Sequence, residues 1–139
     1  MTLTKADYPL AETRPDAITG ARGKKLSAIT LDAVIAGAVA MEDLRITPEA
    51  LKAQAEISRD AGRATLALNF ERAAELVNVP QDFVMQVYEL LRPGRAKSKQ
   101  QLLDAAATLR DTYGASRIAS FIAEAAETYE TRGLFTYRF

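Results

Sequence analysis

The 139-residue sequence contains no cysteine and no histidine. Without cysteine there is neither a disulfide framework nor a thiolate nucleophile. Histidine is the side chain whose unperturbed pKa best suits proton transfer near neutral pH, and a zinc site without either residue would have to be built from carboxylates alone. An acid–base enzyme would then need a perturbed Asp, Glu or Lys, and no isolated candidate stands in an apolar setting. These absences weigh against autonomous catalysis.

The chain also lacks net charge and long apolar runs. Eighteen basic and eighteen acidic residues cancel, whereas a nucleic-acid-binding protein usually carries an excess of positive charge. No apolar run is long enough to cross a membrane, and no apolar signal region follows residues 1–5, so we expect a cytoplasmic protein. The hydrophobic share of 48% is typical of a globular protein, and the length favours a single domain, residues 1–139, that buries about two-thirds of its unfolded surface.

Two short patterns are similar to phosphate-binding segments. Arg92, Arg95, Lys97 and Lys99 cluster around a Pro-Gly pair. We favour a solvated loop between helices there over a phosphate-binding role. In residues 20–25, Gly-Ala-Arg-Gly-Lys-Lys, only two residues separate the glycines where a Walker loop needs four, and no Ser or Thr directly follows the lysine. This segment is therefore interpreted as a turn.

Residues 1–29 are expected to form an extended arm. Pro9 and Pro15 disfavour the helical conformation for the residues before them, and Gly20 and Gly23 permit turns. The apolar residues of the arm are spaced without a helical period. Such an arm can fold back on its own core or lie on another protein. The second interpretation is favoured, because extended segments wrap a partner's surface efficiently.

Residues 30–133 are predicted to form the helical core. Thr47 followed by Pro48 is a strong helix start, because the threonine oxygen caps and a proline at the first helical position loses no needed N–H. Gly62 offers a joint, so residues 48–78 are interpreted as two consecutive helices and not as one bent helix. The other helical segments are expected at about 31–36, at 41–44, between Pro80 and Pro93, at 98–113 and at 115–132.

The periodicity assigns a buried face to each of the last two helices. Ser98 and Gln101 are expected to form a capping box at the start of the first of them. No segment shows sustained strand alternation, so the fold class is all-α, a compact orthogonal or bundle-like set of about five or six helices. The apolar, aromatic tail 134–139 either packs back on the core or marks a contact surface. The predicted faces consist of Leu102, Ala106, Leu109 and Tyr113, and of Ile118, Phe121, Ile122, Ala125 and Tyr129.

Several fragments follow one another in the order found in a known family. They are Asp7-Tyr8-Pro9-Leu10-Ala11, Thr19-Gly20 to Leu26, Ile29-Thr30-Leu31, Asp43-Leu44-Arg45-Ile46, Gln54-Ala55-Glu56-Ile57, Asn69-Phe70 with Arg72-Ala73-Ala74-Glu75-Leu76, and Tyr88 to Arg95. With this series the chain, from about residue 7 to 132, resembles the small (gamma) subunit of adenosylcobalamin-dependent diol and glycerol dehydratases. One departure is Ala96, which stands where the family pattern has a serine.

The resemblance implies a noncatalytic subunit of an α2β2γ2-type assembly that dehydrates 1,2-diols or glycerol to aldehydes. In that family adenosylcobalamin lies between the large (alpha) and medium (beta) subunits, and the small subunit packs on the large one. No catalytic, cofactor-binding or metal-binding residue carries over to this chain, and the isolated chain is expected to be inactive. Only six residues precede Asp7, so packaging into a bacterial microcompartment is unsupported by this chain.

Aromatic and arginine side chains are favoured anchors at interfaces, because they bury a large area and form several directed hydrogen bonds. Two alternatives to a dehydratase subunit remain, a stand-alone helical homo-oligomeric adaptor and a nucleic-acid-binding regulator that uses the Arg92–Lys99 cluster. For Phe70 the alternative is a core position, and for Arg72 an ordinary pair with Glu71 or Glu75 on the helix surface. The expected partner-contact residues are Tyr8, Pro9, Leu10, Asn69, Phe70, Arg72, Arg92 and Arg95.

Overall fold

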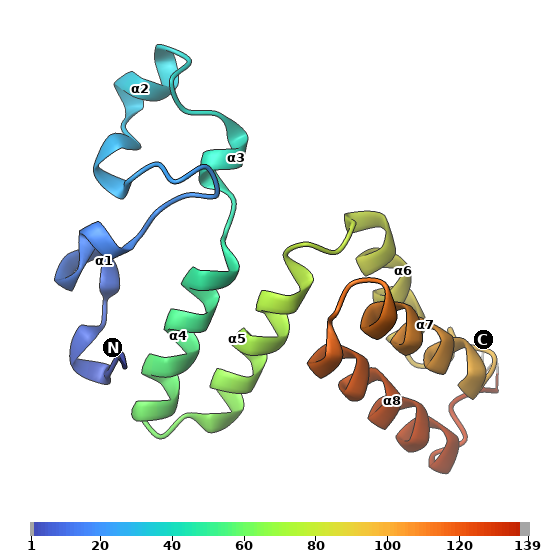
Figure 1. Ribbon diagram of the computed structural model, residues 1–139. Helices are drawn as coiled ribbons and strands as arrows, with labels where there is room; N and C mark the ends of the chain where they lie inside the picture. Colours follow the sequence, from blue (N-terminus) through green and yellow to red (C-terminus); the bar gives the residue numbers. More distant parts are fainter. Residues whose placement is uncertain (1, 137–139) are drawn as a thin grey trace. The chain divides into compact units, whose positions relative to one another are not determined.

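The computed structural model describes residues 2–136 and confirms the all-α prediction (Figure 1). Within these residues the only β feature is an isolated antiparallel bridge between Thr19 and Lys25. Five helices of the described part have 11 residues or more, in agreement with the expected five or six. The chain divides into two compact units, Met1–Val77 and Asn78–Phe139. That residues 1–139 form a single domain stays a prediction.

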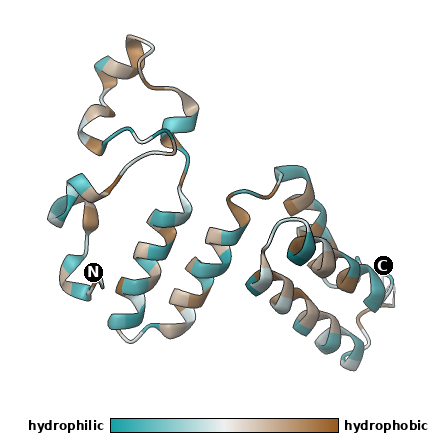
Figure 2. Cartoon of the chain, viewed as in Figure 1, coloured by the Kyte–Doolittle hydropathy of each residue, from teal (hydrophilic) through white to brown (hydrophobic). Residues whose placement is uncertain are grey.

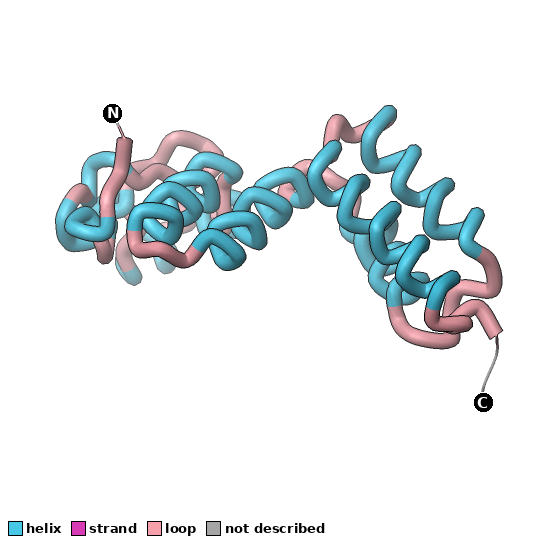
Figure 3. Tube along the Cα trace, turned by 90° about the horizontal axis from the view of Figure 1, so that it is seen from below, coloured by secondary structure: helices cyan, strands magenta, loops and turns pink. Residues whose placement is uncertain are grey.

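The first unit is built on a helical hairpin. Helices α4 (Pro48–Asp60) and α5 (Ala64–Leu76) are separate, as predicted, and lie side by side (Figures 1 and 3). The Thr47 hydroxyl accepts a hydrogen bond of 3.1 Å from the third N–H of α4. Gly62 breaks the helix at a φ of 76°, a left-handed conformation that glycine adopts without a steric penalty. The buried faces of the hairpin include Leu51, Ala55, Ile57, Ala67 and Ala74.

The arm folds back on this hairpin. The backbone N–H of Leu3 donates to Glu56 Oε2 at 2.9 Å, and that of Lys5 donates to Asp60 Oδ2 at 2.8 Å. The arm therefore folds back on its own core, the less favoured of the two interpretations, because carboxylates of α4 accept its backbone N–H groups. That it also lies on another protein stays a prediction. The arm is also less extended than expected. Its short helices are η1 (Lys5–Asp7), α1 (Leu10–Thr13), η2 (Pro15–Ala17) and η3 (Leu26–Ala28).

The second unit consists of α6 (Gln81–Leu91), α7 (Lys99–Asp111) and α8 (Ser116–Thr131), with α7 and α8 side by side (Figures 1 and 3). Its largest fully buried side chains are Leu102, Leu109 and Ile122. The Tyr129 hydroxyl donates a hydrogen bond to the Leu91 carbonyl, which ties α8 to the end of α6. Lys99 of α7 also forms ion pairs with Glu127 and Glu130 of α8, at 2.7 and 2.8 Å. An apolar core and several polar contacts thus hold the three helices together.

The predicted face of α8 is partly wrong. Ile122 is buried as expected, but Phe121 is 38% exposed, and Ala115, Ala119 and Ala126 are fully buried. The buried stripe of this helix consists mainly of small residues. α8 packs on α7, and small side chains let two helix backbones approach closely. The predicted face of α7 is confirmed for Leu102, Ala106 and Leu109, while Tyr113 is half-buried.

The capping box of α7 forms in part, and the described part of the tail packs back on α8. The Gln101 N–H donates to Ser98 Oγ at 3.4 Å, but the Gln101 side-chain oxygen accepts from the N–H of Lys97 at 2.7 Å and not from that of Ser98. The Phe135 ring lies 6.3 Å from that of Tyr129 between centroids. The rest of the predicted tail, residues 137–139, lies outside the described residues.

Replacing Leu102 with alanine should destabilise the second unit by about 2–5 kcal/mol, because the side chain is 0% exposed and its removal leaves a cavity. Urea unfolding followed by circular dichroism measures the change. The control is Met85→Ala on α6, where the side chain is 50% exposed. An equal loss of stability in both variants would contradict the placement of Leu102 at the centre of this core.

Candidate partner-binding surface

The segment from Thr19 to Ile46, here called the 19–46 loop, has a buried carboxylate at its centre. The Asp43 side chain is 0% exposed. Arg22 Nε donates to Asp43 Oδ1 at 2.9 Å, and Arg22 Nη2 donates to Oδ2. The N–H of Ala40 also donates to Oδ2, at 2.9 Å. This carboxylate therefore joins three points of the loop that are up to 21 positions apart in sequence.

Gly20 lies against the same residue. A Cβ atom at position 20 would be 2.6 Å from the carbonyl oxygen of Asp43, so a larger residue would force the two backbones apart. The N–H of Gly20 donates to the Lys24 carbonyl at 2.8 Å, and Lys24 Nζ reaches the Ala38 carbonyl at 2.8 Å. These two hydrogen bonds join the segment before α2 to itself and to the segment after α2, in addition to the ion pair.

Most large hydrophobic side chains of the 19–46 loop are exposed. The loop contains α2 (Leu31–Ile35) and α3 (Met41–Leu44). Val39 is its buried hydrophobic residue. Figure 2 shows brown, hydrophobic stretches along this part of the chain. We name the exposed set the apolar loop surface; it consists of Leu26, Leu31, Val34, Ile35, Met41, Leu44 and Ile46.

The sequence analysis did not find the apolar loop surface. Its signal was nevertheless present in α2, which carries Leu31, Val34 and Ile35 within five residues. A helix of five residues has only about one turn and packs few side chains against the rest of the chain. Some of its three large hydrophobic side chains are therefore expected to be exposed. The exposed fractions reach 74% for Leu31 and 75% for Ile35.

The arm and α4 enclose a cleft of about 450 Å³ next to this surface. Pro9 and Leu10, two expected contact residues, are half-buried in its lining, and Ile46 belongs both to the cleft and to the apolar loop surface. The Tyr8 side chain also lines the cleft but remains 72% exposed. The arm therefore presents one large aromatic ring to solvent above an apolar hollow.

A second buried carboxylate, that of Asp7, shapes the arm. Its Oδ2 accepts from the N–H of Thr4 at 2.8 Å, and its Oδ1 accepts from Arg14 Nε at 2.6 Å. The hydrogen bond from the Thr4 backbone is the largest cause of a lowered pKa for Asp7, and Arg14 lowers it further. The carbonyl of Asp7 accepts from the Thr13 hydroxyl at 2.6 Å. These contacts hold the backbone on both sides of Tyr8.

Asn69, Phe70 and Arg72 lie on α5 in the same unit. Arg72 Nη1 donates to Asn69 Oδ1 at 3.3 Å, so these two expected contact residues interact with each other. Phe70 is half-buried, so its exposure does not decide between the two alternatives left open by the sequence, a core position and a partner contact. Nearby, Glu71 forms an ion pair with Arg59 of α4 at 2.5 Å. This ion pair links the two helices of the hairpin.

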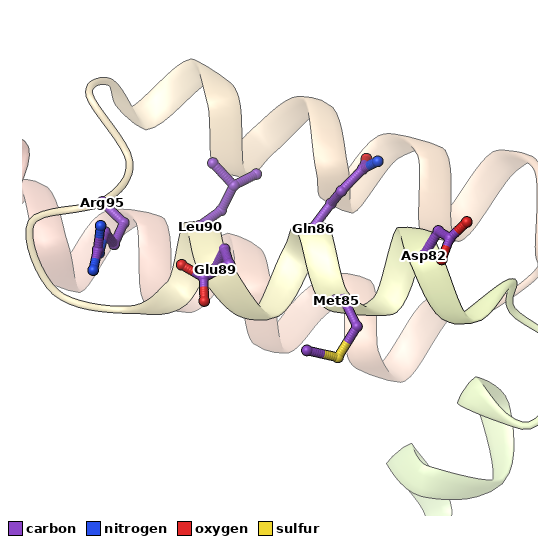
Figure 4. A pocket seen from close by; sticks show the side chains of 6 residues that line it. All are labelled: Asp82, Met85, Gln86, Glu89, Leu90 and Arg95. Carbon is purple, nitrogen blue, oxygen red and sulfur yellow. The ribbon is translucent and has the colours of Figure 1, made fainter.

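Arg92 and Arg95 belong to the second unit and follow α6. Arg92 forms an ion pair with Glu89 at 3.1 Å, and both side chains are about half exposed. Arg95 borders an open hollow of about 660 Å³ with Glu89 and Met85 (Figure 4). The remaining residues that line this hollow are Asp82, Gln86 and Leu90.

The arrangement defines a class of protein, a helical protein with exposed large hydrophobic side chains and without histidine or cysteine. Among residues 2–136 no group of three or more acidic, His or Cys side chains is placed to hold a metal ion. No helix in this part of the chain combines the length and hydrophobicity needed to cross a membrane.

The comparisons with known proteins identify the family. The sequence model of the dehydratase small subunit matches residues 3–136, and the chain belongs to this family. It is 47% identical over 126 residues to the propanediol dehydratase small subunit of Citrobacter freundii, and 46% identical over 127 residues to that of Salmonella typhimurium strain LT2. Each match covers 91% of this chain and 73% of the relative. The chain is therefore the small subunit of a dehydratase complex, and the alternative of a stand-alone adaptor is not favoured.

The Asp43 carboxyl is expected to titrate well below the range of an ordinary aspartate. The Arg22 guanidinium and, after it, the Ala40 N–H lower its pKa from 3.8 to about 2. Because the folded pKa lies below the unfolded one, the charged carboxylate stabilises the folded loop above pH 3.8, and this contribution is lost as the pH falls through about 2. Carboxyl ¹³C NMR titration measures the midpoint directly.

The matched variant is Arg22→Gln, which removes the largest cause of the shift and should raise the pKa of Asp43 towards its ordinary value. Amide exchange in α7 of the second unit serves as a control for general acid unfolding. An Asp43 midpoint that is the same in the wild type and in Arg22→Gln would contradict the ion pair.

Proposed function

We propose that this chain is the noncatalytic small subunit of a coenzyme B12-dependent diol or glycerol dehydratase. The assembled enzyme would convert 1,2-propanediol or glycerol to the corresponding aldehyde and water. The single observation that carries the proposal is the 46–47% identity to two propanediol dehydratase small subunits across 91% of the chain. The exposed apolar loop surface supports it, because a subunit covers such a surface with its partner.

The chemistry would belong to the other subunits. Adenosylcobalamin supplies the radical chemistry when it is bound. We propose that no residue of this chain binds the cofactor, in keeping with the family resemblance, which places adenosylcobalamin between the large and medium subunits. We assign no reaction step to this chain. Its proposed part is to pack on the large subunit and to support that subunit's shape.

The proposed partners are the large (alpha) and medium (beta) subunits in an α2β2γ2-type assembly. The proposed contacts keep the predicted residues, and the structure adds a reason for Tyr8, whose ring is exposed while the backbone around it is held by Asp7. We propose a cytoplasmic protein that binds neither membrane nor nucleic acid. Packaging into a microcompartment, if it occurs, would depend on the partner subunits.

The isolated chain should show no turnover of 1,2-propanediol or glycerol with added adenosylcobalamin. Co-expressed with the two larger subunits from its gene neighbourhood, an affinity-tagged chain should recover both of them with dehydratase activity. An aldehyde assay and gel analysis of the purified complex measure these outcomes. Turnover by the chain alone would overturn the division of roles, and failure to recover the large subunit would overturn the assembly.

Replacing Tyr8 with alanine should weaken binding of the large subunit about tenfold, a loss of about 1.4 kcal/mol, because an exposed aromatic anchor is removed. Arg92→Ala together with Arg95→Ala tests the second unit in the same way. The control is Lys52→Ala, at an exposed position of α4. Titration of the large subunit with labelled small subunit measures the affinity, and equal affinities for Tyr8→Ala and the control would remove Tyr8 from the interface.

A further inference from the structure

In the 19–46 loop a charged side chain is buried and most large hydrophobic side chains are exposed, the reverse of the usual distribution. Its centre is ionic, formed by Asp43 and Arg22, while its large hydrophobic side chains point outward. A folded chain normally buries its apolar side chains and leaves its charges in water, because burial of apolar area is the main driving force of folding. A segment with an ionic centre and an apolar outside has its missing apolar contacts on another molecule.

The size of the apolar loop surface fits a protein partner. Each of its seven side chains is between 38% and 75% exposed. Exposed apolar patches larger than a few hundred Å² typically mark contacts with another protein. The surface also continues into the arm cleft through Ile46. An apolar protein surface is therefore its natural occupant, and not a small polar ligand.

The loop is held in one shape without any help from its outer side chains. Asp43 accepts from Arg22 and from the Ala40 N–H, and the backbone of Gly20 lies directly on that of Asp43. These contacts connect residues before α2 to residues after it. The contacts of Asp43 with Arg22, Ala40 and Gly20 therefore fix the backbone on both sides of α2, and with it the position of the exposed side chains of this helix. A surface that is ordered in advance does not lose further backbone entropy when it binds.

We propose that the 19–46 loop is a preformed docking surface for the large subunit of the dehydratase, with Gly20, Arg22 and Asp43 as positioning residues. The inference rests on the proposed function and goes further, because it assigns the docking to one segment that the sequence analysis did not select. It commits to the large subunit as the occupant, because membership of the dehydratase small subunit family implies a larger subunit in the same complex. A second copy of this chain is the competing occupant.

The experiment uses the full chain, tagged and co-expressed with the larger subunits. The docking variant is Leu31→Gln with Ile35→Gln, which keeps good helix formers on α2 and removes two side chains that are about three-quarters exposed. The control is Lys52→Gln, at an exposed position of α4 outside the apolar loop surface. Recovery of the large subunit should fall at least tenfold for the docking variant and stay unchanged for the control.

The positioning residues are tested by variants that leave the apolar loop surface unchanged. Gly20→Ala forces the backbone away from Asp43, and Arg22→Gln is a milder change that removes the ion pair from its exposed side. Both should reduce recovery of the large subunit. Amide exchange should increase in residues 19–46, whereas the protection of α4, α5, α7 and α8 is retained. Any variant that loses the protection of α4 or α5 is replaced by the milder one for the comparison.

The outcomes separate this inference from the proposed function. If the wild-type chain does not recover the large subunit, the proposed function fails. If the wild type and Leu31→Gln with Ile35→Gln recover it equally, the docking surface is wrong. If that variant only converts a wild-type homodimer to a monomer, the occupant is a second copy, and the proposal is overturned. Full recovery by Arg22→Gln despite increased exchange in the loop would overturn the role of the positioning residues.

Discussion

The ion pair between the half-exposed Arg22 and the buried Asp43 carboxylate is the interaction on which the shape of the 19–46 loop depends. The Asp43 carboxylate accepts hydrogen bonds from the Arg22 guanidinium and from the Ala40 N–H. Removal of Arg22 would leave the Asp43 charge buried without its ion-pair partner, and removal of Asp43 would remove the contacts that join these parts of the loop. The ion pair occupies the centre of the 19–46 loop, a place that apolar side chains would otherwise fill. The apolar side chains then remain available on the outside. One polar constraint thus accounts both for the shape of the loop and for the exposure of its hydrophobic residues.

The helices have a different role from the loop. Pairs α4–α5 and α7–α8 bury small and branched side chains on their facing surfaces and make two stable units. The arm is fixed on α4 by the carboxylates of Glu56 and Asp60, so that its exposed ring is presented from a rigid base. The proposed part of this small subunit is to supply a stable surface to its partner, and the irregular segments of the first unit carry that surface.

Much of the helical structure could be predicted because its signals are local. The Thr47-Pro48 cap and the glycine at 62 lie within a few residues of the helix ends that they set, and both predictions were confirmed. The predicted face of α8 was partly wrong for the opposite reason. The predicted face was chosen by large hydrophobic residues and included Phe121, but Ala119 is fully buried and Phe121 is 38% exposed. Which face is buried depends on the neighbouring helix, and no local pattern contains that information.

The sequence by itself determined the helical class, most helix boundaries, the absence of histidine and cysteine, and the family resemblance that the comparisons confirmed. These depend on composition and on contacts between near neighbours in the chain. Only the tertiary structure decided that the arm folds back on α4 and that the side chains of α2 face outward. Both follow from contacts between residues 14 to 55 positions apart, such as Lys24 with Ala38 and Lys5 with Asp60. Sequence spacing does not specify such pairs, because it does not show which distant donor will meet which acceptor.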